Sequence, residues 1–391
     1  MSVIGIVCEF NPFHNGHKYL INSVKGDNDI VVAVMSGNFV QRGEPAIFSK
    51  EIRTKAALLS GVDVVLELPF VYATASAEYF AFNAVKILSD FGCEKIAFGT
   101  ENADVSSLTR AVDIITNDNF DKEVQEFFTN GISFPAARQM AFDKYKVDCD
   151  ISTPNNILAI EYIKAIRKLN SKLEVVTVNR KGAGYNDNFA VGEFASATHI
   201  RDLIRKKESF ESFVPENVFG LYCDAIENGK YLSAYKFELS ALSVLRSKLN
   251  DDFSDIANIS EGLDNRIKSA INNHNSLEDL YDEIKTKRYT YTRIKRAILS
   301  VLFDVKSNDL EILTPYCRIL GFNTKTSNVM GRLARNSKMP FVASYSDIVK
   351  LQNPEADRVF ELENNSTDLY NLVLNNSGLC STEKTFSPIK I

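Results

Sequence analysis

The stretch Ile4-Gly5-Ile6-Val7-Cys8-Glu9-Phe10-Asn11-Pro12-Phe13-His14-Asn15-Gly16-His17-Lys18 decides the fold of this chain. Its apolar, β-rich start predicts a buried strand, and the apolar spacing from Tyr19 to Val24 predicts a helix directly afterwards. A strand that feeds a helix through a tight turn directs backbone N–H groups and the positive helix end to one point, which suits an anion. Two histidines there add donors for several phosphate oxygens. The stretch therefore predicts a site for a nucleoside triphosphate.

Two other interpretations of the histidine pair are open at this point. A pair at this spacing could contribute to a zinc site, but only His199 and His274 remain as further imidazoles, and no Cys-x-x-Cys pair occurs. The side chains could instead cap the helix. We predict no resident metal ion.

Length and composition set the general class of protein. A chain of 391 residues exceeds one typical core, so we expect two domains. The net charge of −5 provides no global attraction for nucleic acid, so any such contact needs a local basic patch. The six scattered cysteines are typical of reduced core residues. No leader or membrane-spanning run is recognisable, and we expect a cytoplasmic protein without a membrane partner. The sequence makes no prediction about oligomeric state.

Four further apolar runs follow the opening strand, at 29–35, 62–68, 95–98 and 173–178, and helical patterns fill the gaps between them. Short, nearly continuous apolar strands that alternate with helices predict an α/β fold with a five-stranded parallel sheet covered on both faces. Ligands of such sheets bind beyond the carboxyl ends of the strands. We therefore expect the polar residues that follow these strands, including Gly99 and Arg180, to gather at one edge.

Three other segments carry candidate site residues. Ser196 and Thr198 can cap a helix that also contains Arg201, and an arginine fork matches phosphate oxygens; an ordinary capped surface helix is the alternative. Arg42 lies in an unusually polar connection, which we interpret as a lid or, alternatively, as a solvated loop. Asn155 and Asn156 begin a helix, so that one of them could act only as a cap.

The second half of the chain has a different pattern. From 209 to 391 the periodicity is helical without a clear series of strands, and the tail after about 375 is expected to be loosely ordered. We predict a first domain over 1–208 and an all-helical domain over 209–391. The segment 285–296 combines two tyrosines with a run of basic side chains, which favours a polyanion or, alternatively, a solvated helix face. The candidate polyanion-binding residues are Lys285, Lys287, Arg288, Arg293, Lys295 and Arg296.

The motifs carry a family resemblance. His14-Asn15-Gly16-His17, together with 196–201, resembles the nucleotidylyltransferase superfamily, although Ala197 stands where many relatives have a hydroxyl. The segments 9–17, 35–43, 154–158, 288–290 and 316–322 together look like those of the bacterial tRNA(Met) cytidine acetate ligases. This resemblance implies a Rossmann-like nucleotidylyltransferase domain that binds ATP and a helical domain that binds tRNA.

The resemblance also implies a reaction and a set of site residues. The family activates acetate with ATP and acetylates the N4 amine of the wobble cytidine of elongator tRNA(Met). We expect Mg²⁺ on the phosphates. His14, His17 and Arg42 are the expected catalytic residues, and the sequence identifies no base for the acetyl transfer. The expected ATP-binding residues are Ile6, Val7, Cys8, Glu9, Phe10, Asn11, Pro12, Phe13, His14, Asn15, Gly16, His17, Lys18, Tyr19, Gly99, Asn155, Asn156, Arg180, Lys181, Ser196, Thr198 and Arg201.

Two alternative functions are open to a chain with this sequence. One is a small-molecule adenylyltransferase of cofactor synthesis, which would need no helical domain with a basic segment. The other is a non-catalytic RNA-binding protein with a nucleotide-binding fold, which would have little use for both histidines. The ATP-dependent, tRNA-directed ligase accounts for both halves of the chain.

Overall fold

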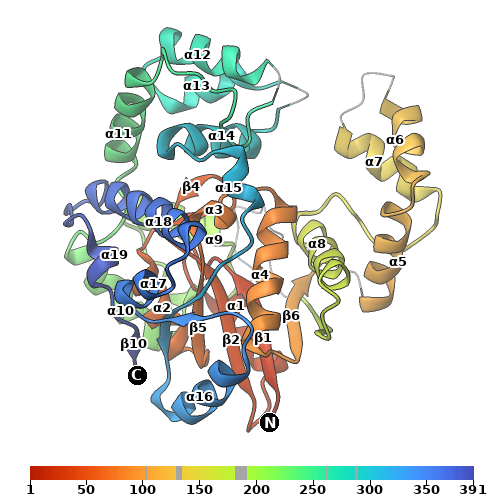
Figure 1. Cartoon of the computed structure of the whole chain (residues 1–391), viewed down its shortest axis with the longest axis vertical. Helices are drawn as coiled ribbons and strands as arrows, with labels where there is room; N and C mark the ends of the chain where they lie inside the picture. The colour runs from red at the N-terminus through yellow and green to blue at the C-terminus, as the bar shows by residue number, and fades with distance from the viewer. Residues whose placement is uncertain (102–103, 129–133, 181–191, 261, 287–288) are drawn as a thin grey trace.

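The computed structural model describes residues 1–101, 104–128, 134–180, 192–260, 262–286 and 289–391. Its centre is the predicted parallel sheet, which is confirmed: the five strands lie in the order β5-β2-β1-β6-β7 (Figure 1). Their bounds are Val3–Cys8 for β1, Ile30–Ser36 for β2, Val64–Leu68 for β5, Lys95–Thr100 for β6 and Glu174–Asn179 for β7.

The apolar runs form strands because the sheet is buried on both faces. All seven residues of β2 are buried, and successive side chains point to opposite faces. Val34 belongs to a core cluster with residues of α4, whereas its neighbour Ala33 belongs to a second cluster with residues of α2. A continuous apolar run, rather than an alternating one, is therefore what this strand requires.

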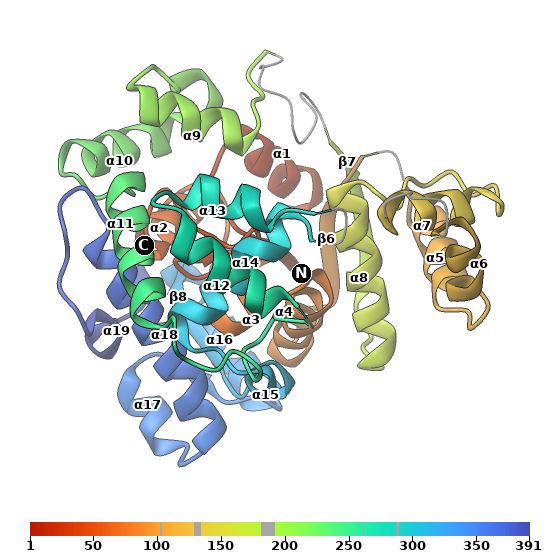
Figure 2. The ribbon, with the colours of Figure 1, turned by 90° about the horizontal axis from the view of Figure 1, so that it is seen from above.

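Helices α1, α2, α4 and α8 pack against these two faces. The helices of the first half are α1 (Asn15–Val24), α2 (Lys50–Leu59), α3 (Phe70–Ala73), α4 (Ala77–Phe91), α5 (Val105–Ile115), α6 (Phe120–Phe128), α7 (Phe134–Asp143), α8 (Pro154–Lys168) and α9 (Ala197–Lys206). A short hairpin, β3 (Phe39–Val40) and β4 (Glu44–Pro45), follows β2. Helices α5 to α7 project to the side of α8 (Figures 1 and 2).

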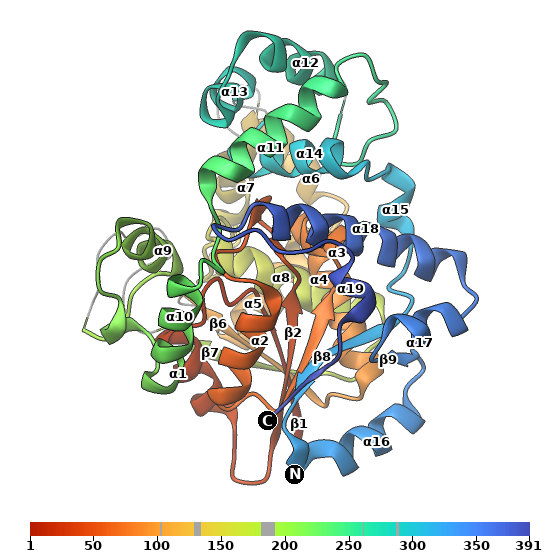
Figure 3. The same cartoon turned by 90° about the vertical axis from the view of Figure 1, so that its left-hand side faces the viewer.

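The second half is mainly helical, as predicted. Its helices are α10 (Glu216–Glu227), α11 (Ala234–Ser247), α12 (Leu263–Asn273), α13 (Leu277–Ile284), α14 (Tyr291–Phe303), α15 (Ser307–Glu311), α16 (Ser327–Asn336), α17 (Tyr345–Lys350), α18 (Pro354–Leu372) and α19 (Thr382–Thr385), with 3₁₀ turns at Glu211–Phe213 and Thr324–Thr326. Helices α11 to α14 lie over the carboxyl edge of the sheet, and α16 lies at the opposite end (Figures 1 and 3).

The expectation that the second half is all-helical is wrong in one respect. Strand β8 (Cys317–Phe322) extends the central sheet by pairing antiparallel with β5, and β10 (Ile389–Lys390) and β9 (Phe341–Val342) pair with β8. The division of the chain after residue 208 stays a prediction, since three strands of the later segment belong to the sheet of the first.

A buried ionic cluster joins the end of the chain to this sheet. Lys50 Nζ lies 2.5 Å from Glu67, 3.0 Å from Glu363 and 2.5 Å from Glu383, and Arg318 contacts Glu67 at 3.1 Å and Glu383 at 2.6 Å. All five side chains are at most 2% exposed. The expectation of a loose tail is therefore wrong, because Glu383 on α19 completes a buried cluster.

The described helices are not of the membrane-spanning kind. Over the part of the chain that the structure describes, none is both long and apolar enough to span a bilayer.

Candidate functional site

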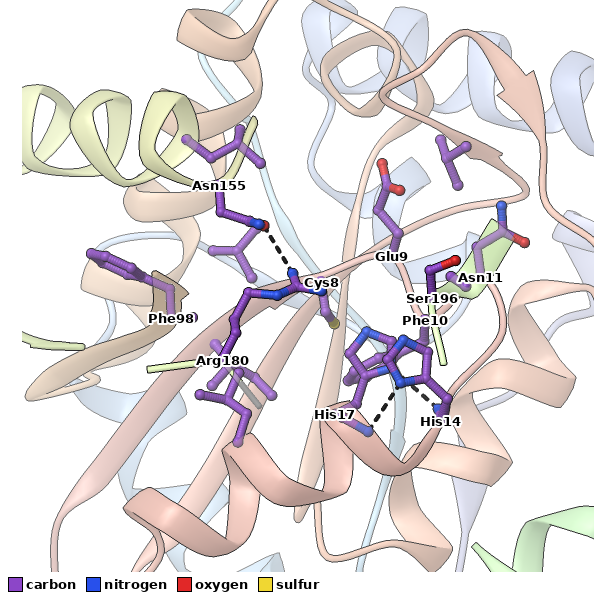
Figure 4. A pocket seen from close by; sticks show the side chains of 18 of the residues that line it. Cys8, Glu9, Phe10, Asn11, His14, His17, Phe98, Asn155, Arg180 and Ser196 are labelled. Carbon is purple, nitrogen blue, oxygen red and sulfur yellow. Dashed lines mark hydrogen bonds between the residues drawn. The ribbon is translucent and has the colours of Figure 1, made fainter. Parts of the chain in front are cut away.

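A cavity opens at the carboxyl ends of the strands, where the sheet topology predicts a ligand. The turn after β1, the β3–β4 hairpin, the ends of β6 and β7, and the first turns of α8 and α9 all contribute to its lining (Figure 4). The predicted residues found in the lining are Ile6, Val7, Cys8, Glu9, Phe10, Asn11, His14, Gly16, His17, Tyr19, Arg42, Gly99, Asn155, Arg180, Ser196, Thr198 and Arg201.

His14 and His17 form a reciprocal cap at the start of α1. The Nδ1 atom of His14 accepts a hydrogen bond from Gly16 N–H at 3.0 Å, and the Nδ1 atom of His17 accepts one from His14 N–H at 3.2 Å. The two rings lie side by side with their centroids 3.8 Å apart. An imidazole that accepts at Nδ1 carries its proton at Nε2 when it is neutral. Capping and ligand binding are therefore compatible, because they use different nitrogens.

Both imidazoles are held in the neutral form. Burial, with the positive charges of Arg180 and Arg201, lowers the pKa of His14 from 6.5 to about 3. Burial also lowers the pKa of His17, and His14 and Arg180 add to that effect. At neutral pH the pair therefore offers two N–H donors and no net charge.

The start of α9 forms a second polar wall. Ser196 caps this helix by accepting a hydrogen bond from His199 N–H at 3.1 Å. The guanidinium of Arg201 donates to the Asn11 carbonyl at 2.8 Å and to the Thr198 hydroxyl at 3.1 Å. These bonds fix Arg201 beside the turn after β1, with its charge facing the cavity.

Arg180 and Asn155 form the opposite wall. Arg180, directly after β7, donates to the Asn155 side-chain oxygen at 3.1 Å (Figure 4). Asn155 in turn donates to Glu101 at 2.7 Å. Asn156 is instead buried outside the lining, where its side chain donates to the Asp150 carbonyl at 2.9 Å. The geometry therefore favours Asn155 as the ligand contact.

Some predicted residues do not line the cavity. Phe13 is fully buried, with its N–H bonded to the Tyr222 hydroxyl at 3.0 Å. The Asn15 side chain donates to the carbonyls of Glu193 and Ser212, and Lys18 is exposed on α1. The residues outside the lining are Pro12, Phe13, Asn15, Lys18 and Asn156, and Lys181 lies outside the described residues.

The sequence prediction missed several lining residues. Leu158 and Tyr162 follow Asn155 at helical spacing on one face of α8, and this spacing was a usable signal. Tyr162 packs against Phe98 with ring centroids 5.3 Å apart, which gives the cavity an aromatic wall. Glu44, also in the lining, carried no comparable signal in the sequence.

The predicted basic segment reaches the rim of the cavity. Lys295 on α14 forms an ion pair with Glu44 at 3.4 Å, and Glu44 also faces Arg201 at 3.8 Å. Arg293 donates to the Ser260 hydroxyl at 2.9 Å and stacks on the Tyr289 ring. Lys285, at the end of α13, stacks on the ring of exposed Tyr291, and Arg296 is half-buried. Lys287 and Arg288 lie outside the described residues. Some basic side chains of this segment therefore make contacts within the protein itself.

The cavity has the donors of an anion site rather than the ligands of a metal site. The described ranges contain no group of three or more His, Cys, Asp or Glu side chains placed to hold a metal ion. The cavity instead combines three guanidinium groups with hydroxyl and imidazole donors, which is a donor set for phosphate oxygens.

Comparisons with known proteins agree with this donor set. Residues 1–384 match the model of the family described as HIGH Nucleotidyl Transferase. The tRNA(Met) cytidine acetate ligase of Acetivibrio thermocellus is 38% identical, with 99% of each chain covered, and that of Caldicellulosiruptor saccharolyticus is 40% identical, covering 95% of this chain and 94% of the relative.

Solved structures give the same relationship. The apo form of Thermotoga maritima TmcAL superposes with a TM-score of 0.92 at 34% identity. The same protein bound with alpha-thio ATP superposes with a TM-score of 0.89 at 33% identity. All of both chains is covered in each comparison.

Proposed function

The chain belongs to the HIGH nucleotidyl transferase family and, within it, to the tRNA(Met) cytidine acetate ligases, and on that basis we propose its function. It is a ligase that uses ATP to convert acetate into acetyl-adenylate and then acetylates the N4 amine of the wobble cytidine of elongator tRNA(Met). The observation that carries this proposal is the full-length similarity to a solved structure that holds an ATP analogue, in a chain whose own cavity is lined with phosphate donors.

The first step joins acetate to the α-phosphorus of ATP and releases pyrophosphate. Acetate is ionised at neutral pH, since carboxyl groups of this kind have pKa values near 4, and it attacks without a general base. Catalysis then consists mainly of positioning and of stabilising charge on phosphoryl oxygens. His14 and His17 donate hydrogen bonds from their Nε2–H groups to these oxygens, and Arg42 from the β3–β4 hairpin adds positive charge.

The remaining wall residues hold the nucleotide. Arg201 and the hydroxyls of Ser196 and Thr198 suit the terminal phosphates, and we assign Arg180 and Asn155 to the ribose and α-phosphate. Mg²⁺ retains water and substrate phosphates as ligands in many ATP sites, so the ion would enter with ATP. We propose a cytoplasmic location, where ATP and tRNA are both present.

The tRNA approaches from the side of α14. Helices α11 to α14 lie over the edge of the sheet at which the cavity opens (Figure 1). The ion pair between Lys295 and Glu44 links α14 to the rim of the cavity. Lys285 and Arg293 of this region, with Lys287 and Arg288 between them in sequence, are the proposed phosphate-backbone contacts. Phosphate contacts position an RNA without reading its sequence.

Incubation with ATP, labelled acetate and bulk tRNA, followed by nucleoside analysis, tests the function. We expect label in N4-acetylcytidine from elongator tRNA(Met), with AMP and pyrophosphate as products. Label in no nucleoside would contradict the tRNA-directed ligase. Adenylylation of a small acceptor instead of acetate would identify the chain as an adenylyltransferase of cofactor synthesis.

A further inference from the structure

The cavity contains a carboxylate to which the proposed ATP step assigns no catalytic role. Glu9 follows β1 directly and lies in the lining, where its Oε1 atom accepts a hydrogen bond from Gln41 N–H at 2.8 Å. Its carboxylate points to a different part of the cavity from the rings of His14 and His17 (Figure 4). A carboxylate repels phosphate oxygens, so this position is unsuited to a second phosphate contact.

The surroundings of Glu9 make it a stronger base than an exposed glutamate. Desolvation raises its pKa from 4.5, and the negative charge of Glu44 adds to this effect. The Gln41 hydrogen bond and the positive charges of Arg42 and Arg201 act in the opposite direction. Other titratable groups with an electrostatic influence here are Cys8, Arg53 and Tyr162.

The other described lining residues are poor acceptors for a proton. Glu44, the only other carboxylate among the described lining residues, faces Arg201 with one oxygen and pairs with Lys295 through the other. His14 and His17 use Nδ1 in the cap of α1. Burial keeps the Cys8 thiol and the Tyr162 hydroxyl protonated by raising the pKa of each.

We propose that Glu9 is the general base of the acetyl-transfer step, an inference that rests on the proposed function. The cytidine N4 atom attacks the acetyl carbonyl carbon of acetyl-adenylate and forms the N–C bond. The acyl C–O bond to the phosphate breaks, and AMP leaves with the electron pair. The N4 proton becomes acidic as the N–C bond forms, and it moves to the Glu9 carboxylate. Carboxylates are also the side chains that accept from cytosine N4, so Glu9 both positions and deprotonates the amine.

The test measures adenylate formation and acetyl transfer separately in the variants Glu9→Gln and Glu9→Asp. Glutamine keeps an oxygen for Gln41 N–H but cannot take a proton, so the fold and the cavity wall are retained. Acetate-dependent exchange of label between pyrophosphate and ATP reports the first step. Single-turnover transfer from preformed acetyl-adenylate to tRNA reports the second. We expect Glu9→Gln to lose transfer by about 10²–10⁴-fold, the usual contribution of a general base, and to lose far less of the exchange.

A pH profile distinguishes a base from a merely structural group. The transfer rate of the unaltered protein should rise with pH through an ionisation above 4.5, since Glu9 must be ionised to accept the proton. This rise of the transfer rate with pH should be absent in Glu9→Gln and present in Glu9→Asp. Equal transfer rates in the glutamine variant would overturn the proposal. Equal losses of exchange and transfer would also overturn it and would place Glu9 in the ATP step.

The proposed function can fail separately from this inference. If the unaltered protein transferred no acetyl group to tRNA, the ligase function itself would be wrong. If the unaltered protein transferred it and Glu9→Gln did so equally well, only the role of Glu9 would be wrong.

Discussion

At the scale of single residues, we propose that His17 uses its two ring nitrogens for different tasks. The Nδ1 atom accepts a hydrogen bond from His14 N–H, which leaves Nε2–H as the proposed donor to phosphate. In His17→Asn the side-chain oxygen can replace Nδ1, whereas in His17→Gln the amide can reach the position of Nε2. We expect the asparagine variant to lose about 10²–10³-fold in acetate-dependent pyrophosphate exchange, the usual effect of removing one such donor. The glutamine variant should retain more exchange, and both should bind tRNA normally. If the two variants showed equal pyrophosphate exchange, the assignment of Nε2–H as the donor to phosphate would be wrong.

The neutral state of His14 has a consequence for stability. Its pKa is about 3 in the folded protein and about 6.5 when unfolded, so the unfolded chain binds more protons between these values. Stability is therefore complete above pH 6.5 and falls as the pH is lowered towards 3. Asparagine can cap α1 without titrating. We expect the free energy of unfolding to fall about 2 kcal/mol further between pH 7.5 and 5 in the unaltered protein than in His14→Asn. Urea titrations at both pH values measure this difference, and parallel curves would contradict a neutral His14.

At the scale of elements, the β3–β4 hairpin is held against α14 by a close backbone approach. Gly43 has φ of +76°, and a Cβ atom there would lie 2.6 Å from Arg296 N and 2.8 Å from the Lys295 carbonyl carbon. We expect Gly43→Ala to destabilise the protein by more than about 1 kcal/mol and to slow pyrophosphate exchange, because Arg42 moves with the hairpin. Gly220→Ala is the matched control, since Gly220 lies inside α10 with nothing within 4 Å of its added Cβ. The control should be stabilising by about 0.5–1 kcal/mol. A neutral Gly43→Ala would show that the two elements are not tightly packed.

The role of the α13–α14 region in tRNA binding is a separate question of elements. Lys285 and Arg293 both stack on tyrosine rings near the start of α14, and we expect them to contact the tRNA backbone. The double variant Lys285→Gln/Arg293→Gln should bind tRNA more weakly. Its plot of log affinity against log salt should also be shallower by about 0.7–0.9 for each tRNA phosphate that the variant no longer neutralises. Arg332→Gln/Arg335→Gln on α16, at the opposite end of the molecule, is the control and should change neither quantity (Figure 3). An unchanged slope in the first variant would leave these side chains with a purely structural role.

At the scale of the whole molecule, local patterns and long-range contacts differ in how far they could be predicted. The five parallel strands were predictable because each contains a short apolar run rich in β-branched or other strand-forming residues, and β2 and β5 are buried along their whole length. Strand β8 was not, since it contains Arg318, whose partners Glu67 and Glu383 lie far away in sequence. The sequence could not favour Asn155 over Asn156 as a cavity residue. It could not place Glu44 in the lining either, because both assignments depend on contacts between distant segments. The histidine pair could be placed at the cavity from sequence because both histidines lie within four consecutive residues directly after a strand.

The buried ionic cluster explains how the end of the chain stabilises the whole fold. Glu383 contacts both Lys50 and Arg318, and the cations Lys50 and Arg318 contact Glu67 on β5. Loss of the Glu383 carboxylate removes one ion pair from each of the two cations, and breaking a buried ion pair costs about 3–5 kcal/mol. We therefore expect Glu383→Gln to lower the free energy of unfolding by about 3 kcal/mol and to make the segment after residue 377 sensitive to limited proteolysis.

Glu361→Gln provides the matched control for this last prediction. Glu361 pairs with Arg358 on α18 at 3.0 Å, but its side chain is 58% exposed, and exposed pairs contribute about 0–1 kcal/mol. Its removal should leave both stability and proteolysis nearly unchanged. Similar effects of the two variants would mean that the tail is not held by its buried charge. A large effect confined to Glu383→Gln, with cleavage in the tail before global unfolding, would show that the last residues complete the sheet that carries the cavity.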